Sequence, residues 1–281
     1  TDAQVSWTLS GFGDEIDPDP RVQIAVLKAL GAQHIEVRSA WGVNVVDLSD
    51  EQLAELASLL KDAGLGVSAV ASPIGKVDIS LDPELEVRRL QRIIRVAHAL
   101  ETPNIRIFSF FRGEGVPVES TRDAVMTGLR LLADEAEKER VTLLHENEKD
   151  IYGDTPERVL DLVETVASPA LRLAWDSANF VQVGVAHPHD DGYAKLRPYL
   201  DYLQVKDAVA ATGEVVPAGQ GDGQVLQTVQ ALAADGYTGF ASLEPHLAQA
   251  HALGGFSGPV AFGEAARAFA ALLAEAGVST R

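Results

Sequence analysis

VTLLHENEKDIYGDTPERVLDLVETV, residues 141–166, contains one complete strand–loop–helix unit. The run VTLLHE (141–146) is too continuously apolar to face water on one side, which is typical of a strand in a buried parallel sheet. TPERVLDLVETV (155–166) repeats apolar residues at helical spacing, and Thr155 followed by Pro156 is typical of a helix N-cap with proline at the first helical position. The strand therefore ends in a charged loop, and a helix follows that loop.

The same alternation extends in both directions along the chain. The eight segments predicted to be strands are 5–12, 34–38, 66–72, 104–111, 141–146, 171–176, 202–207 and 239–244. The segments predicted to be helices are 21–31, 50–64, 83–100, 121–139, 155–166, 222–236 and 262–277, with a shorter helix expected around 193–200. Strict alternation of strands and helices indicates a parallel sheet covered by helices.

Eight strand–helix units are the number that closes a (β/α)8 barrel. The rival fold is an open, doubly wound sheet, but its first strand–helix turn would carry G-x-G-x-x-G, and GFGDEIDPDP (11–20) is acidic and lacks that spacing. No linker or low-complexity stretch interrupts the pattern. The sequence therefore predicts an α/β fold, a single TIM barrel domain over residues 1–281.

The composition excludes several classes of protein. The chain has 41 acidic and 23 basic side chains, a formal net charge of −18, which would repel the phosphates of nucleic acid and of anionic lipid. The sequence contains no cysteine, which leaves histidine, carboxylates and amides as metal ligands. No run of about 18 apolar residues predicts a membrane span, and no secretory leader is recognisable. We expect a cytoplasmic protein without nucleic-acid or membrane partners.

Charged and amide side chains follow the last four predicted strands. Glu146, Asp176 and Glu244 stand at equivalent positions on three of them. In a barrel the carboxyl ends of the strands assemble the active site, so these three acids should converge. Any one of them taken alone is more simply a solvated strand end. Three together would repel one another unless a divalent cation neutralised them, and the pattern therefore predicts a metal site rich in oxygen ligands.

At these positions the sequence resembles the xylose-isomerase-like barrels, which include sugar phosphate isomerases and epimerases, tagatose 3-epimerase, hydroxypyruvate isomerase, inosose dehydratase and the endonuclease IV group. The resemblance rests on HENEKDIYGDTPE, WDSANF, YLQVKDA and SLEPH. It implies one divalent ion held by Glu146, Asp176 and Glu244. Gln204 stands where the family usually has histidine, and its amide oxygen favours Mn²⁺ or Mg²⁺ over Zn²⁺. We expect Mn²⁺ first, with Mg²⁺, Co²⁺ or Zn²⁺ as alternatives.

The resemblance also implies proton transfer next to a carbonyl of a small keto-sugar or polyol. Glu146 and Glu244 would act on opposite faces of one carbon, through an enediolate. Lys206 would neutralise the developing oxyanion, unless it only pairs with Asp207. The predicted substrate-binding residues are Lys206, Glu148, Asn179, His246, Arg112 and Glu36. A homo-oligomer is a further expectation from the family.

Several other functions remain open from the sequence. A metal-dependent dehydratase or lyase acting on an inosose or a 3-keto-glycoside would share the first step and then expel a β-substituent. A non-catalytic sugar-binding barrel would follow if Gln204 had cost the protein its metal. An endonuclease is disfavoured by the negative charge and by the missing histidine. Because Arg112 and Lys206 are the only cations expected at the mouth, phosphorylated substrates are not favoured.

Overall fold

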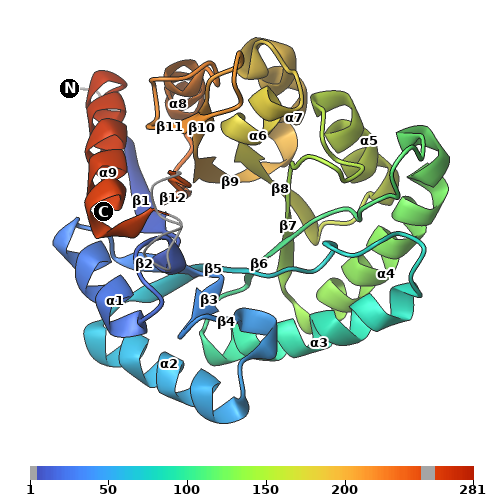
Figure 1. Cartoon of the computed structure of the whole chain (residues 1–281), viewed down its shortest axis with the longest axis horizontal. Helices are drawn as coiled ribbons and strands as arrows, with labels where there is room; N and C mark the ends of the chain where they lie inside the picture. Colours follow the sequence, from blue (N-terminus) through green and yellow to red (C-terminus); the bar gives the residue numbers. More distant parts are fainter. Residues whose placement is uncertain (1–4, 248–256) are drawn as a thin grey trace.

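The computed structural model of the protein describes residues 5–247 and 257–281. Eight parallel strands form a closed barrel that helices surround (Figure 1). In spatial order these strands are β1 (Val5–Gly11), β12 (Phe240–Leu243), β9 (Leu200–Val205), β8 (Leu171–Asp176), β7 (Thr142–Glu146), β6 (Asn104–Ile107), β5 (Gly66–Ala71) and β2 (His34–Val37). A parallel bridge between Phe12 and Glu36 joins β1 to β2 and completes the circle.

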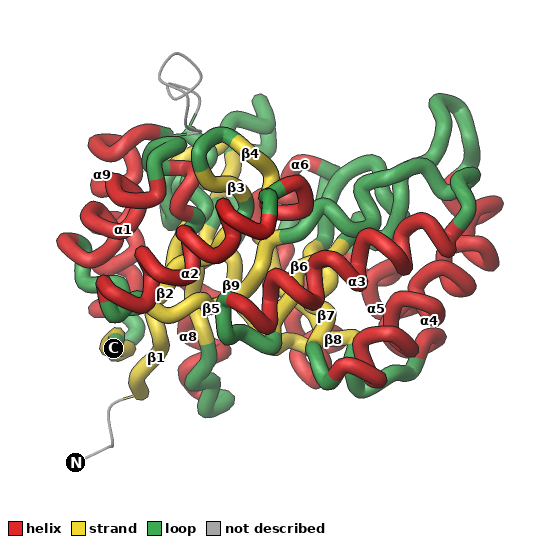
Figure 2. The backbone as a smooth tube through the Cα atoms, turned by 90° about the horizontal axis from the view of Figure 1, so that it is seen from below, coloured by secondary structure: helices red, strands yellow, loops and turns green. Residues whose placement is uncertain are grey.

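Three smaller strand pairings lie outside the eight strands of the barrel. β13 (Val278–Thr280) adds a ninth strand parallel to the beginning of β1. The hairpin of β3 (Ser39–Ala40) and β4 (Val43–Asn44) follows β2. The hairpin of β10 (Asp207–Ala208) and β11 (Val215–Val216) follows β9. Figure 2 shows β3 and β4 at the edge of the molecule opposite the N-terminus, which is the edge where the barrel strands end.

The helices follow the boundaries that their end residues favour. They are α1 (Pro20–Ala29), α2 (Asp50–Ala63), α3 (Pro83–Ala99), α4 (Arg122–Glu139), α5 (Pro156–Val166), α6 (Ser177–Gln182), α7 (Ala194–Leu196), α8 (Val225–Ala234) and α9 (Gly258–Glu275). Ser49 and Gln52 form a reciprocal capping box at the start of α2. Thr155 caps α5 through the backbone N–H of Arg158, with proline at the first position. Within the described residues, no helix is long and apolar enough to cross a membrane.

Alternation along the strands places the polar side chains above an apolar layer. Ala69, Leu144, Ala174 and Tyr202 pack together as a buried cluster, with Phe240 against it. Side chains two residues apart on a strand share a face. The acids that end β7 and β8 therefore project on the same face as this cluster, one step closer to the carboxyl ends of the strands.

The predicted α/β barrel is confirmed, and the boundaries of several elements are corrected. Strand 104–111 ends at Ile107, because Phe110 adopts φ 73° and the following backbone bonds instead to the loop after β5, with Phe108 N–H donating to Ile74 O. Strand 202–207 runs from Leu200 to Val205. The last helix begins at Gly258, four residues earlier than predicted. The helix around 193–200 is a series of short helical turns that starts at His189.

Candidate functional site at the barrel mouth

Three carboxylates converge at the carboxyl ends of the strands. Glu146 ends β7, Asp176 ends β8, and Glu244 directly follows β12. One carboxylate oxygen from each lies within 4.8 Å of the others. All three side chains are buried, with exposed fractions of 1%, 0% and 3%. Because buried like charges repel strongly, this arrangement requires positive charge close by.

Local hydrogen bonds hold these acids in place. Asp176 is also the N-cap of α6, since its Oδ1 accepts the backbone N–H of Asn179 at 3.0 Å. The side chain of Asn147 ties β7 to β8, donating to the carbonyl of Asp176 at 2.9 Å and accepting its N–H at 3.0 Å. Asn179 Nδ2 donates to Asn147 O at 2.9 Å and lies 3.5 Å from Glu146 Oε2. The amides therefore fix the geometry, and the acids retain free oxygens.

Lys206 supplies one positive charge inside the cluster. Its Nζ donates to Glu244 Oε1 at 2.8 Å and lies 3.1 Å from Asp176 Oδ2. The structure does not show the alternative, a simple ion pair between Lys206 and Asp207. Asp207 accepts backbone N–H groups of the glycine-rich loop that follows β11, including those of Gly219 and Gly223, at 2.9 Å each. Lys206 thus belongs to the acidic cluster, and Asp207 organises the loop beside it.

Two arginines face the same acids from other strands. Arg106 Nη1 on β6 lies 3.7 Å from Glu146 Oε1 and 3.8 Å from Glu244 Oε2. Its guanidinium also lies 4.6 Å from the ring centre of Phe108, a cation–π contact. Arg38 follows β2, lies 3.8 Å from Glu244 Oε2, and forms a two-point ion pair with Asp14. Both arginines are therefore held by other groups while they face the carboxylates.

These contacts shift the pKa values of the three acids apart. Burial, together with repulsion by Glu244, raises the pKa of Glu146 well above its ordinary value. Burial raises the pKa of Asp176 to about 6 against the attraction of Lys206. Burial also acts to raise the pKa of Glu244, but attraction to Lys206 and Arg38 outweighs it, and that pKa is lowered. The two glutamates thus differ in proton affinity, which is the condition for one to accept a proton while the other donates.

The free oxygen atoms of the cluster fit a divalent metal. Glu146 Oε1, Gln204 Oε1 and Glu244 Oε2 are buried without a hydrogen-bond partner, and Asp176 Oδ2 has only its ion pair with Lys206 at 3.1 Å. A buried polar atom left unsatisfied costs about 1–3 kcal/mol, so three at one end of the barrel need an explanation. Carboxylate and amide oxygens are the donors that Mg²⁺ and Mn²⁺ prefer. A divalent ion bound by one oxygen from each of these four residues would give all four oxygens a partner.

A cavity of about 310 Å³ opens over the cluster, and it corrects one expectation. Five cationic side chains line it, namely Arg38, Lys76, Arg106, Lys149 and Lys206. Three carboxylates line it, namely Glu146, Glu148 and Glu244. The expectation of only two cations at the mouth was therefore wrong, because Arg38 and Arg106 come from β2 and β6 and Lys76 from the loop after β5.

The structure places the other predicted residues in two groups. Glu148, Asn179 and His246 line the cavity with Lys206. His246 also bonds to the buried carboxylate of Glu15 through Nδ1 at 3.0 Å. Arg112 and Glu36 are not among the residues that line it. Arg112 donates to the carbonyl of Ile151 at 3.2 Å, and Glu36 is fully buried inside the barrel.

Sequence reasoning missed Arg106, Arg38 and Lys76. Arg106 stands inside the strand NIRI, and a charged residue between two isoleucines was a signal that could have found it. Arg38 follows Glu36 by two residues and so shares its face of β2. Lys76 lies in the irregular loop after β5, so strand alternation does not predict its direction. The shape of that loop depends on Gly75 at φ 86°, where a Cβ atom would meet the backbone of Phe108.

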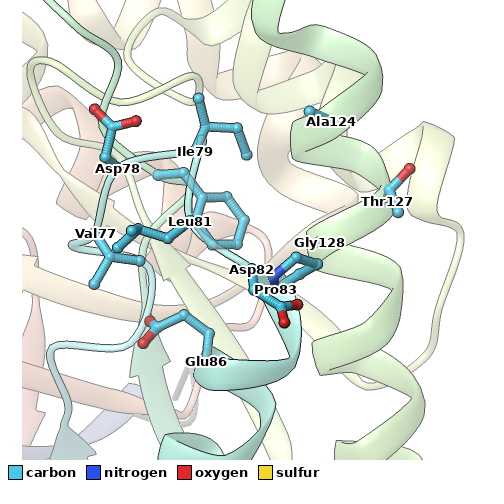
Figure 3. Close-up of a pocket in the computed structure, with 11 residues that line it drawn as sticks. Val77, Asp78, Ile79, Leu81, Asp82, Pro83, Glu86, Ala124, Thr127 and Gly128 are labelled. Carbon is cyan, nitrogen blue, oxygen red and sulfur yellow. The ribbon is translucent and has the colours of Figure 1, made fainter.

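A second hollow lies outside the barrel. It measures about 170 Å³ and lies between the loop after β5 and α4, with Val77, Ile79 and Leu81 on one side and Ala124 and Thr127 on the other (Figure 3).

Among the residues that the structure describes, the three carboxylates of the mouth form the one group of His, Cys, Asp or Glu side chains close enough to hold a metal. The barrel mouth is therefore the candidate active site.

Residues 24–275 match the family described as xylose isomerase-like TIM barrels. The chain belongs to this family. It is 29% identical over 221 residues to 2-epi-5-epi-valiolone 7-phosphate 2-epimerase of Actinoplanes sp. (strain ATCC 31044 / CBS 674.73 / SE50/110), a match that covers 76% of this chain and 78% of that protein.

Two solved structures share the fold at low sequence identity. A D-tagatose 3-epimerase-like protein superposes with a TM-score of 0.76 at 16% identity, covering 96% of this chain and 98% of its own. A xylose isomerase-like TIM barrel protein from Mycobacterium smegmatis in complex with magnesium superposes with a TM-score of 0.71 at 21% identity, covering 97% of each chain. These likenesses show the barrel fold.

Proposed function

We propose that this protein is a divalent-metal-dependent epimerase or isomerase that moves a proton on a carbon next to a carbonyl of a small keto-polyol. The observation that carries the proposal is the convergence of the buried carboxylates of Glu146, Asp176 and Glu244, together with the buried oxygens of Glu146, Gln204 and Glu244 that lack a hydrogen-bond partner. Mn²⁺ is the ion we expect there, with Mg²⁺, Co²⁺ and Zn²⁺ as alternatives. When bound, the ion would supply Lewis-acid polarisation of the substrate oxygens.

The chain's own residues divide the proton transfer between two strands. Glu146 at the end of β7 and Glu244 after β12 would act on opposite faces of one carbon, one removing the proton and the other returning it. Lys206 lies between Asp176 and Glu244 as a buried ammonium, where it would stabilise negative charge that develops on a substrate oxygen. Glu148, Asn179 and His246 would contact the hydroxyl groups of the substrate.

The charge of the cavity favours a substrate that carries an anionic group such as a phosphate ester. Five cations and three carboxylates line the cavity of a protein whose formal net charge is −18. A divalent ion would make this excess of positive charge larger. Lys76 and Lys149 are the exposed cations of the lining, with Lys76 4.0 Å from Glu148, and they suit an anion at the rim. The 29% identical relative is named for a phosphorylated cyclitol, which agrees with this substrate class.

The test is a deuterium-exchange assay on the full chain loaded with Mn²⁺. Phosphorylated and unphosphorylated keto-polyols are incubated in D₂O and followed by ¹H NMR. We expect loss of one signal next to the carbonyl and appearance of the epimer. An unsaturated product would instead establish the dehydratase or lyase that shares the first step. No exchange with any substrate, in a protein that binds the sugar, would establish a non-catalytic barrel.

Two further predictions concern the protein as a whole. A homo-oligomer is expected from the family, and light scattering on the purified chain would measure its mass. A cytoplasmic location stays a prediction from the sequence. Fractionation of the source cells would measure it.

A further inference from the structure

Glu36 is a buried carboxylate inside the barrel, next to the acidic cluster. Its side chain is fully buried, and it is not among the residues that line the mouth cavity. Oε1 accepts the hydroxyl of Tyr202 at 2.7 Å, and Oε2 accepts Nε2 of Gln204 at 3.1 Å. Both donors stand on β9, two residues apart and on one face of the strand. Glu36 is therefore not placed to contact a substrate in the cavity, and its neighbour toward the acidic cluster is Gln204.

The hydrogen bond to Glu36 fixes which end of the Gln204 amide faces it. Oε2 of Glu36 accepts from Nε2 of Gln204, and a glutamine amide has an NH₂ end and a carbonyl end. Glu36 therefore takes the NH₂ end, and the carbonyl oxygen of Gln204 points elsewhere. That oxygen is buried and has no hydrogen-bond partner. Gln204 is level with Asp176 in the pairing of β8 with β9, so its free oxygen belongs to the level of the acidic cluster.

We infer that Glu36 is a positioning residue that orients the Gln204 amide so that its carbonyl oxygen, and not its NH₂ group, is presented to a divalent cation. This inference rests on the proposed metal site. Without Glu36 the amide could turn by half a rotation and present NH₂ hydrogens, which repel a cation. Ligands to metals are commonly held by a second hydrogen-bonding group, and losing such a group costs about tenfold to a hundredfold in metal affinity.

The test measures Mn²⁺ binding to the metal-free full chain by isothermal titration calorimetry. Glu36→Gln retains size and packing but offers one acceptor oxygen in place of two. When that oxygen accepts from Tyr202, the new amide turns its NH₂ end to Gln204, which must reverse to accept it. We expect the Kd for Mn²⁺ to rise about tenfold or more. Tyr202→Phe is the matched control, because it removes the other donor to Glu36 and leaves the Gln204 contact; its Kd should stay close to that of the parent.

A rescue variant separates positioning from a general structural role. In Glu36→Gln with Gln204→Glu, the introduced carboxylate accepts from the introduced amide with one oxygen and retains the other for the cation. We expect this double variant to recover the affinity for Mn²⁺ that Glu36→Gln loses. A folded double variant without recovery would overturn the inference, as would a Glu36→Gln protein that binds Mn²⁺ like the parent. If the parent itself binds no Mn²⁺, the proposed function fails first, and the two failures are thus distinguishable.

Discussion

The barrel mouth has two walls of opposite charge. The acidic wall consists of Glu146 on β7, Asp176 on β8 and Glu244 after β12, and β9 with Gln204 lies between β8 and β12. The cationic wall consists of Arg106 on β6, Lys76 after β5 and Arg38 after β2, which are neighbours on the other side of the barrel. The acidic wall has buried oxygens without partners, whereas Arg38 and Arg106 are held by Asp14 and by aromatic rings. The acidic wall therefore needs a cation for its buried oxygens. The arginines of the cationic wall are already held in place and can bind an anion.

The strongest way to break this comparison is to remove one acid from the acidic wall. Glu146→Gln preserves the size of the side chain but replaces a charged carboxylate ligand by a neutral amide and removes a proton-transfer group. We expect kcat for deuterium exchange to fall by about 10²–10⁴-fold, and Mn²⁺ binding to weaken as well. Steady-state kinetics at saturating Mn²⁺ and calorimetry would measure the two effects.

Glu148→Gln is the matched control for that variant. Glu148 lines the same cavity, two residues after the end of β7, but is outside the group of three converging carboxylates. Its substitution should leave Mn²⁺ affinity unchanged and lower activity far less. Equal losses in the two variants would contradict the division into an acidic wall and its surroundings.

The second prediction removes the cation that faces the acidic wall from β6. Arg106→Gln takes away the buried positive group that lies 3.7 Å from Glu146, whereas Glu244 keeps Lys206 at 2.8 Å and Arg38 at 3.8 Å. Leaving buried charge uncompensated costs about 3 kcal/mol, so the free energy of unfolding of the metal-free protein should fall by that order. Saturating Mn²⁺ should restore much of the loss, because it compensates the same carboxylates. Urea unfolding with and without Mn²⁺ would measure both.

An exposed arginine provides the control for this stability measurement. Arg172 pairs with Asp201 on the surface, where the two side chains are 28% and 44% exposed. Arg172→Gln should change the free energy of unfolding by less than about 1 kcal/mol. Its change should not depend on Mn²⁺. If Arg106→Gln behaved like Arg172→Gln, the two walls would not be coupled.

The two walls also differ in how far they could be predicted from the sequence. The acids close apolar strands, so strand alternation and the barrel rule together predict that Glu146, Asp176 and Glu244 meet at the mouth. Arg106 lies within its strand and Lys76 in an irregular loop, so neither stands at a strand end. Tyr202, which holds Glu36, has the sequence pattern of an ordinary apolar core residue. Contacts between distant strands decide these roles, and a single sequence does not contain them.

The third prediction sharpens the role of the cationic wall at its rim. Lys76→Gln removes a charge that lines the cavity but keeps most of the length of the side chain. We expect KM for a phosphorylated substrate to rise about tenfold, near 1.4 kcal/mol, with little change in kcat, because the anion is bound far from the reacting carbon. An unphosphorylated analogue should show no change. Lys61→Gln, on α2 away from the cavity, is the control; the same rise in KM there would indicate a general effect of charge.

The smallest effect is expected from charges outside the barrel, where water competes with every pair. Asp161 on α5 accepts from Arg122 Nε at 2.8 Å and from the hydroxyls of Tyr152 and Thr165. The hydrogen bond from Arg122 lowers the pKa of Asp161 to about 2, against the effect of burial. Because the folded value lies below that of the unfolded chain, the stabilisation is present above about pH 4 and is lost as pH falls toward 2.

Asp161→Asn should therefore lower the midpoint of thermal unfolding at pH 7 by about 2 °C. The difference from the parent should shrink as pH falls from 4 to 2, because the parent then loses the same charge. Calorimetry at several pH values would measure it, with and without Mn²⁺. Since Asp161 does not line the mouth cavity, Mn²⁺ should raise the midpoint equally in both proteins. A shift that depended on Mn²⁺ would mean that the outer charges are coupled to the acidic wall, and the distinction between the mouth and the surface would fail.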